Sequence, residues 1–442
     1  MINNVLTVNN GYLFFKIGIF LLLSAPIPGA IFLFLSLIIS FYNNKNLFFQ
    51  DKWNQPFIFA TIFLLLIVSI SSLDFYSNDL PNWNIYLNWI GLANWIPMFI
   101  SVCGFKPYLN SYSKIRKISI LLIIGTIPLF ITGILQVFFK IYGPFEYFGG
   151  LITSYQKWGS DGLSGLFSNK NYAGTWLIII WPLTIALFRE RLNKNRLNRF
   201  YILLFPIFTL SAIFLTNSRN AWLGTFISTL LLSNQTLILI LTLIFLFLVI
   251  LILAATTDLF PIFLNDFAIK IIPNDILSRF TAIYGFSYFA NYPRIDIWRN
   301  TINFIIERPF LGWGAASFPI LYKSINIECC YKNYLRWIAH THNFPLEIAF
   351  NYGILFSIFI NSLIFLILFK SYKLIFLLPN KFSKNITKDY FNKSWWVSCL
   401  TLYLSQFFDI QYYDLRISIV FWILISGLIC RIQYETKECL DK

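Results

Sequence analysis

Charged side chains are scarce in this sequence. Only 12% of its 442 residues are Asp, Glu, Lys or Arg, about half the share typical of soluble domains, whereas 57% are hydrophobic. This composition excludes a water-soluble enzyme and a disordered chain. Apolar runs such as 237–254 also exclude a membrane β-barrel, whose short strands alternate apolar and polar residues. We therefore expect an all-α polytopic membrane protein.

Patterns that bind metals or form disulfide frameworks are missing as well. The six cysteines show no CxxC spacing and no nearby group of histidines, so neither a zinc site nor a disulfide framework is expected. The adjacent Cys329 and Cys330 leave two alternatives open, two ordinary thiols or a vicinal disulfide, of which thiols are preferred. No cofactor motif is found, because Gly312-Trp313-Gly314 is a tight turn without the strand and helix of a dinucleotide site.

Positive charge is in excess, with 34 Lys and Arg against 19 Asp and Glu, a net charge of +15. In a membrane protein this excess marks cytoplasmic loops, so no nucleic-acid partner is expected. The loops 106–117, 189–199 and 370–393 are strongly basic and are all placed in the cytoplasm.

About twelve transmembrane helices satisfy this arrangement, with both termini in the cytoplasm of a single integral membrane domain, 1–442. The loop 255–342 then lies outside, where it is expected to be folded and helical, since a structureless loop of that length would be unusual. The expected spans are 12–41 (two, broken at Pro26-Ile27-Pro28-Gly29), 57–73, 84–103, 118–140, 173–188, 200–216, 222–254 (two, broken at Ser233-Asn234-Gln235), 344–369, 394–410 and 416–431.

The only two histidines of the chain, His340 and His342, stand just before the span 344–369. Asn343 is a plausible helix cap, and Glu347 falls in the first turn. The positive end of the helix dipole keeps a nearby imidazole neutral, as a general base requires. For a His-x-His pair alone, an interfacial hydrogen-bonding role is the commoner outcome. A metal site is disfavoured because no third ligand is evident.

Two arginines are placed where a phosphate could bind. Arg219 lies in the outer turn 216–222 before a helix start, a favourable place for an anion, although snorkelling at the interface is the commoner fate of such a residue. Arg294 lies at the edge of the apolar face of an amphipathic helix that begins at Pro293 and ends before Pro309. Plain anchoring to the membrane surface is the alternative for this helix. Its expected apolar face comprises Ile295, Trp298, Ile302, Ile305 and Ile306.

Three motifs between residues 216 and 353 follow one another in a distinctive order. They are Ser-Arg-x-Ala-Trp-Leu-Gly at 218–224, Arg-x3-Trp-Arg continuing to Arg-Pro-Phe-Leu-Gly-Trp-Gly at 294–314, and His-x-His-Asn-x2-Leu-Glu at 340–347 before Asn351-Tyr352-Gly353. In this order the chain resembles the O-antigen ligase/polymerase superfamily. Cyanobacterial members are similar in particular around 161–174 and 409–416.

The resemblance implies the helical fold of lipid-carrier glycosyltransferases. Members transfer a glycan from an undecaprenyl diphosphate carrier to an acceptor hydroxyl at the periplasmic face of the bacterial inner membrane, and the ligases are metal-independent and inverting. The acceptor would be lipid A-core, another glycan or a protein. By match to the family motifs, His342, Arg219 and Arg294 would be catalytic. Supporting roles are expected for His340, Arg279, Arg299 and Arg308 in substrate binding, with His340 as the alternative base, and for Asp409 and Asp414 in ordering the outer rim.

A membrane transporter, for example of bicarbonate, is the main alternative. A transporter should carry polar residues near the bilayer midplane or inverted repeats, whereas the notable charges here cluster toward the outer face. A non-catalytic scaffold would leave the paired histidines and the long outer loop without an explanation. The sequence does not separate a ligase from a polymerase or a protein O-glycosyltransferase, and it gives neither the glycan nor the oligomeric state.

Overall fold

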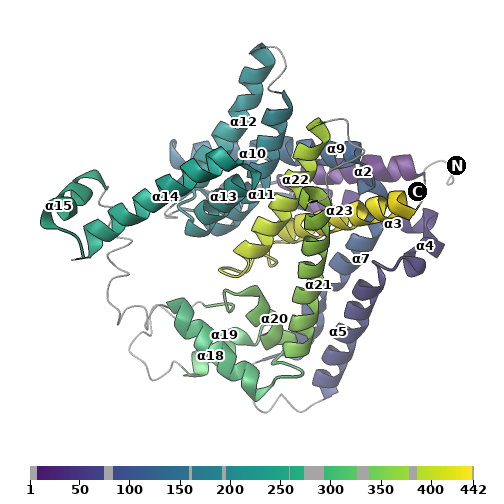
Figure 1. Cartoon of the computed structure of the whole chain (residues 1–442). Coiled ribbons are helices and arrows are strands. Elements are labelled where there is room, and N and C mark those ends of the chain that lie inside the picture. The colour runs from purple at the N-terminus through teal and green to yellow at the C-terminus, as the bar shows by residue number, and fades with distance from the viewer. Residues whose placement is uncertain are drawn as a thin grey trace.

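In a computed structural model, the described part of the chain is mostly helical (Figure 1). The structure describes residues 7–73, 83–158, 162–191, 196–257, 259–272, 293–325, 338–377 and 386–440. Among these residues the strands form one antiparallel hairpin, β1 (Phe145–Tyr147) and β2 (Ile152–Ser154), in which Phe145 pairs with Ser154. An all-helical polytopic fold is confirmed, with this small hairpin as an addition in the expected outer segment 141–172.

The helices alternate between long apolar segments and short connectors. Those before the hairpin are α2 (Val8–Leu21), α3 (Pro26–Asn43), α4 (Lys45–Gln50), α5 (Gln55–Leu73), α6 (Tyr86–Gly91), α7 (Ile96–Gly104), α8 (Lys106–Leu109), α9 (Tyr112–Gly125) and α10 (Ile127–Val137). Those after it are α11 (Lys170–Arg191), α12 (Arg196–Leu215), α13 (Arg219–Leu232), α14 (Gln235–Thr256), α15 (Ile262–Ile271), α18 (Pro293–Glu307), α19 (Phe318–Ile325), α20 (Phe344–Tyr352), α21 (Ile354–Tyr372), α22 (Ile386–Ser405) and α23 (Leu415–Leu440).

Seven helical segments of the described chain are long and apolar enough to cross a membrane. Two shorter apolar helices lie at 200–215 and 242–256, and the remaining expected spans are also helical, as α2, α13 and α22. A multi-pass membrane protein is therefore confirmed, while twelve crossings and cytoplasmic termini stay predictions. The seven segments are 26–43, 55–73, 86–104, 112–137, 170–191, 354–377 and 415–433.

Two expected breaks between spans are confirmed, and further breaks appear, among them one at Trp95 within the expected span 84–103. The chain turns between α2 and α3 and again between α13 and α14 at residues 233–234, as the sequence predicts. The expected span 118–140 is divided at Thr126, where Pro128 in the next turn lacks a backbone N–H. The expected span 344–369 is divided at Gly353, whose φ of 88° lies in the left-handed region and ends α20.

Two hydrophobic cores meet at α20. The main core is built by the membrane helices and includes Phe344 and Tyr352 of α20. A second core joins α18, α19 and the opposite side of α20, where Phe304, Trp313 and Phe350 pack together. We call the part formed by 293–325 with α20 the outer block. It carries the helical structure expected within 255–342, and its location outside the cytoplasm stays a prediction.

The helix α18 has the predicted bounds but a different buried face. Pro293 begins it and it ends at Glu307, before Pro309. The residues buried against the outer block are Ile297, Thr301, Phe304 and Ile305, whereas Ile302 and Ile306 are exposed. The helix α18 therefore packs on a protein core with one side and presents Ile302 and Ile306 of the expected apolar face on another, and contact of that face with the membrane stays a prediction.

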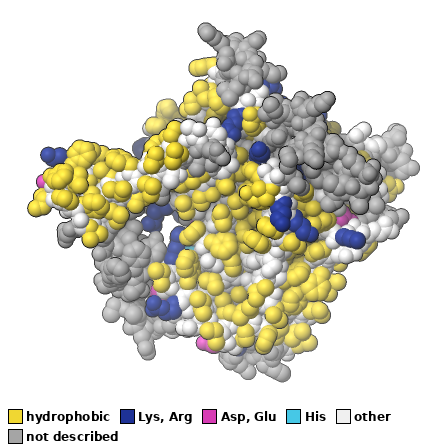
Figure 2. All heavy atoms as spheres, viewed as in Figure 1, with side chains coloured by type: hydrophobic (Ala, Val, Ile, Leu, Met, Phe, Trp, Pro, Cys, Tyr) yellow, Lys and Arg dark blue, Asp and Glu magenta, His cyan; other side chains and the backbone are white. Residues whose placement is uncertain are grey.

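Apolar side chains cover much of the molecular surface, as lipid contact requires. Figure 2 shows them over the projecting arm of α14 and α15 and across the body below it. Along α14 the exposed residues include Leu239, Leu243, Phe247 and Ile250. In water such a surface would be unstable, but in a bilayer it faces hydrocarbon of equal polarity.

Candidate active site

The histidine segment is fixed on three sides. Asn343 caps α20, because its Oδ1 accepts from the backbone N–H of Leu346 at 3.1 Å, as predicted. The Asn343 amide also donates to the carbonyl of Phe407 at 3.0 Å, which ties the segment to the turn after α22. From α18, the indole of Trp298 donates to the carbonyl of Thr341 at 3.0 Å. His342 itself has a φ of 55°, so the backbone turns sharply just before the helix.

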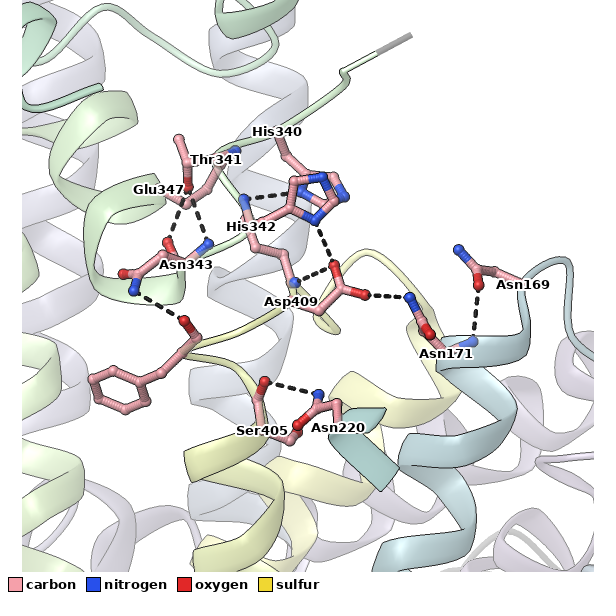
Figure 3. Close-up of polar contacts among 12 residues, drawn as sticks. Asn169, Asn171, Asn220, His340, Thr341, His342, Asn343, Glu347, Ser405 and Asp409 are labelled. Atoms are coloured by element: carbon pink, nitrogen blue, oxygen red, sulfur yellow. Dashed lines mark hydrogen bonds and ion pairs between the residues drawn. The ribbon is translucent and has the colours of Figure 1, made fainter. Parts of the chain in front are cut away.

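His342 is paired with a carboxylate from the far end of the chain (Figure 3). Its Nδ1 lies 2.9 Å from Oδ1 of Asp409. The second oxygen of Asp409 accepts from the side-chain amide of Asn171 at 3.0 Å, and the backbone N–H of Ile410 donates to Oδ1. Asp409 is buried and His342 is partly exposed, so the pair offers the ring of His342 to a ligand and keeps the carboxylate inside.

The two histidines have different hydrogen-bonding states. The Nδ1 of His340 accepts from the backbone N–H of His342 at 3.2 Å, so this nitrogen carries no proton. Burial, followed by the neighbouring His342, lowers the pKa of His340, which keeps the ring neutral with its proton on Nε2. Beside Asp409, by contrast, a neutral His342 places its proton on Nδ1. Its Nε2 is then the unprotonated nitrogen.

Asp409 is ionised although it is buried. Burial by itself would raise the pKa of this carboxyl. The hydrogen bond from His342, together with electrostatic interactions with the two histidines and with Arg294, outweighs burial and holds the pKa below its usual value. Arg294 at the start of α18 therefore lies close enough to the histidine–aspartate pair to act on it electrostatically.

The other arginines differ in their placement. Arg219 begins α13, and the next residue, Asn220, donates to the carbonyl of Ser405 at 3.1 Å, on the helix that leads to Asp409. Its convergence with His342 stays a prediction. Arg308 lies over the ring of Trp313, 3.9 Å from the centroid, which is a packing role within the outer block. Arg299 is exposed on α18. Arg279, like Cys329 and Cys330, lies outside the described residues.

Three residues that the sequence did not single out as site residues support the pair. Asn171 orients Asp409, as described above. Glu347, expected only as a first-turn acid, is buried and accepts from the backbone N–H of Thr341 at 2.9 Å and from the hydroxyl of Tyr413 at 2.7 Å. The ring of Tyr413 lies 5.8 Å from that of His340. The nearest sequence signals were the similarity around 161–174 and 409–416, which contain Asn171, Asp409 and Tyr413.

The glycines at 312, 314 and 353 have a role in packing. Gly312 and Gly314 have φ values of 71° and 88°, which confirms the tight turn. The backbone N–H of Trp313 between them donates to the carbonyl of Phe350 at 2.7 Å. A side chain on Gly353 would come within 2.0 Å of the carbonyl oxygen of Phe310. The two motifs therefore hold α20 and the outer block in contact and carry no reacting group.

His340, His342 and Asp409 also meet the spacing of a metal site, because one ligand atom from each lies within 4.8 Å of the others. The third ligand that the sequence did not reveal is thus present. In this arrangement, however, the Nδ1 of His342 is bonded to Asp409 and the Nδ1 of His340 accepts from the backbone. The expectation that no metal takes part stays a prediction.

Comparison with known families supports the resemblance seen in the motifs. Residues 204–360 match the family model described as O-antigen ligase. This stretch contains Arg219, Arg294 and both histidines, whereas Asn171 and Asp409 lie outside it on either side. No curated protein matches the chain.

Proposed function

Through residues 204–360 this chain belongs to the O-antigen ligase family, an enzyme family, and we propose that it is a metal-independent, inverting glycosyltransferase. The donor is a glycan on undecaprenyl diphosphate, and the acceptor is a hydroxyl group at the periplasmic face of the bacterial inner membrane. The observation that carries this proposal is the His342–Asp409 pair, in which the ring of His342 is partly exposed and Arg294 acts electrostatically on Asp409.

The proposed chemistry uses His342 as the general base. Its Nε2 takes the proton of the acceptor hydroxyl while the oxygen attacks the anomeric carbon from the face opposite the diphosphate, so the configuration inverts. Asp409 holds the ring in the required tautomer and stabilises the imidazolium that forms. The diphosphate leaves with the bonding electrons, and Arg294 with Arg219 stabilises its growing charge.

His340 is better suited to donate than to accept. Its Nδ1 is occupied by the backbone N–H of His342, and its Nε2 carries the proton. A neutral N–H donor at this place fits a hydroxyl or a phosphate oxygen of the substrate. This geometry supports the proposal that His342 is the base and that His340 binds the substrate.

Variants in a strain that lacks the chromosomal gene test the proposal. The measured quantities are the glycan left on the lipid carrier and the glycan on the acceptor. His342→Ala should lose transfer by about 10²–10⁴-fold with donor binding nearly intact. Arg294→Ala and Arg219→Ala should weaken donor binding and slow transfer together, because the diphosphate is charged before and after bond cleavage. Replacement by Lys should rescue only in part, since the ammonium lacks the planar fork.

Lys323→Ala, at an exposed position of α19, is the control for loss of positive charge in the outer block. Carriers with a single unlinked repeat in the deletion strain would identify a polymerase, and polymer left on the carrier would identify a ligase. An unchanged glycan with impaired carbon uptake would contradict the proposal and favour a transporter such as one for bicarbonate.

A further inference from the structure

A polar cavity of about 820 Å³ lies far from the histidines and is not used by the proposed chemistry. Its wall is formed by the end of α3, the segment 48–54, the end of α7 with the start of α8, and the part of α23 near Cys430 and Gln433. Its volume falls within the range of about 300–1,000 Å³ typical of ligand sites.

Two helices separate this cavity from the histidines. Helix α3 begins at Pro26, which lines another cavity together with Tyr413, and the ring of Tyr413 lies 5.8 Å from that of His340. The 18 residues of α3 then span about 27 Å, close to the thickness of the hydrocarbon layer. Helix α23 begins two residues after Tyr413 and reaches the polar cavity at Cys430. Since both helices are long and apolar enough to cross a membrane, the cavity lies at the membrane face opposite the histidines.

The carboxylate described in the cavity wall, that of Asp51, is already saturated with donors. Its Oδ1 accepts from the backbone N–H of Trp53 at 2.9 Å and from the side-chain amide of Gln433 at 2.8 Å. Its Oδ2 accepts from the ammonium of Lys106 at 2.8 Å and from the same amide at 2.9 Å. Because a carboxylate offers about four acceptor positions, Asp51 has none left for a cationic ligand.

Donor groups, by contrast, remain in the wall. Lys106 is buried, and its ammonium donates to Asp51 and to the side-chain oxygen of Asn54. An ammonium has three N–H groups, so among the contacts of the described residues one is left for a ligand. Lys52 adds an exposed ammonium to the same wall. The remaining capacity of the cavity is therefore to donate, which suits an anion.

Further ammonium groups surround the cavity. Lys114 donates to the side-chain oxygen of Asn110 in the wall at 2.9 Å, and Lys370 lies over the ring of Trp53, 5.2 Å from its centroid. Because Asp51 is neutralised within its own ion pair, these lysines leave an excess of positive charge. Basic pockets between membrane helices are typical sites for the headgroups of anionic lipids.

The outer face of α3 offers room for acyl chains beside the cavity. Ile31, Leu35 and Ile38 are exposed and lie along one stripe of the helix. The stripe continues to the exposed Tyr42, next to Phe41 in the cavity wall. Since α3 is long enough to span a membrane, this stripe faces hydrocarbon. A lipid can thus lie along α3 and place its headgroup in the cavity.

We propose that this cavity binds the headgroup of an anionic phospholipid from the leaflet opposite the histidines, with its phosphate at Lys106 and Lys52 and its acyl chains along α3. A phosphate diester carries a negative charge and unesterified oxygens that accept hydrogen bonds, which matches the donors in the wall. A soluble phosphate compound would use the same donors without needing α3. The proposal does not depend on the transferase function, because lipid binding is measured without transfer.

Lipid retention by the purified full-length protein tests what the cavity binds. Native mass spectrometry from detergent counts the lipids that stay bound after phosphatidylglycerol or phosphatidylcholine is added at equal concentration. Phosphatidylglycerol should be retained in preference, and millimolar inorganic phosphate should not displace it. Equal retention of the two lipids would overturn the inference. Displacement by inorganic phosphate would also overturn it, because the cavity would then belong to a soluble phosphate compound.

A pair of charge variants tests whether the lipid binds in the cavity. Lys52→Gln removes a positive charge from the wall and leaves the ion pair of Asp51 intact, so it should weaken retention of phosphatidylglycerol by about fivefold. Lys117→Gln is the matched control, because Lys117 is exposed at the start of α9 and lies outside the cavity wall. An equal loss in both variants would show that the lipid binds to surface charge in general.

A second pair changes the space in the cavity and leaves the charge unchanged. Asn110→Trp places a large ring in the wall and should lower retention of phosphatidylglycerol to the level of phosphatidylcholine. Ser113→Trp, at an exposed position outside the wall, should behave as wild type. Size-exclusion chromatography checks that both variants are folded. Undiminished retention by a folded Asn110→Trp would place the lipid elsewhere on the protein.

Discussion

The Nδ1 atom of His342 lies 2.9 Å from Oδ1 of Asp409, although the two residues are 67 positions apart in the chain. His342 comes from the segment that begins α20, and Asp409 comes from the turn between α22 and α23. The amide of Asn171 from α11 completes the contact. Three separate parts of the chain must therefore be in place before the proposed base has its correct tautomer.

Asp409→Asn should reduce turnover by about 10²–10⁴-fold, because an amide can present its NH2 group to Nδ1 and stabilise the tautomer with a protonated Nε2. Donor binding should remain, since the cationic groups are unchanged. Asn171→Ala should give a smaller loss, because Asp409 keeps its contact with His342. Initial rates and donor binding measured on the same membranes check this. Equal turnover of Asp409→Asn and wild type would show that the carboxylate has no positioning role.

The pKa of His340 sets a limit on the acid side of the pH profile. Its pKa is lowered from 6.5, mainly by burial, so folding favours the neutral ring. Above pH 6.5 both the folded and the unfolded chain hold a neutral ring. Below it the unfolded histidine takes a proton and the folded one does not, so the site loses stability as the pH falls. Transfer should decline in the same direction.

His340→Asn is the matched variant for this pH effect, because its Oδ1 can still accept the N–H of His342 and cannot take a proton near neutral pH. Its transfer should depend less on acid than that of the wild type. An unchanged acid limb in the variant would assign the limb to another group.

Removal of metal ions and addition of Zn²⁺ should have different effects on the rate of transfer. EDTA should leave transfer unchanged, because the proposed base needs only Asp409 and the leaving group needs only cationic side chains. Zn²⁺ should inhibit reversibly, since His340, His342 and Asp409 are close enough to bind it and binding would occupy the base. His340→Asn should weaken this inhibition. Loss of transfer in EDTA that returns with added metal would contradict the metal-independent mechanism.

Gly353→Ala should lower the free energy of unfolding by at least about 2 kcal/mol, because the residue has a positive φ and its new methyl group would collide with the carbonyl of Phe310. Gly149→Ala is the control, since Gly149 has a φ of 67° but nothing lies within 4 Å of the added atom. It should cost about 1 kcal/mol. Thermal unfolding in detergent, followed by size-exclusion chromatography, distinguishes them. Equal losses would mean that strain alone matters at Gly353.

Engineered cysteines test the topology in a background without the native cysteines. An impermeant thiol reagent should label a cysteine at the exposed Trp158 from outside and should not reach one at Asn195, in a basic loop predicted to be cytoplasmic. Both should react after the membrane is permeabilised. Labelling at Asn195 in intact cells would rule out the proposed arrangement of twelve spans.

The helices and most of their bounds could be predicted, because hydrophobic length alone identifies a membrane helix. The cap at Asn343 and the bounds of α18 were also predictable, since both depend on residues adjacent in sequence. The break at Gly353 was hidden within an apolar run, because only the close approach of Phe310 requires a left-handed residue there. The residues adjacent to Gly353 in the sequence do not reveal a contact with a residue more than 40 positions away.

The histidines were identifiable from the sequence, but their partner was not. The sequence suggested that Asp409 orders the outer rim, and the structure brings it into direct contact with His342. The face of α18 that packs on protein could not be predicted, for a related reason. A helix that packs on a protein core with one side and exposes Ile302 and Ile306 on another has two apolar faces, and periodicity alone does not say which is covered.

The sharing of α20 between two cores has a mechanical consequence. Phe350 belongs to the outer block, and Phe344 and Tyr352 belong to the membrane core, so the helix cannot tilt without disturbing both. The packing of α20 therefore fixes the position of the histidines at its start. In the proposed reaction both substrates must therefore move to the histidines, because the histidines cannot move to them.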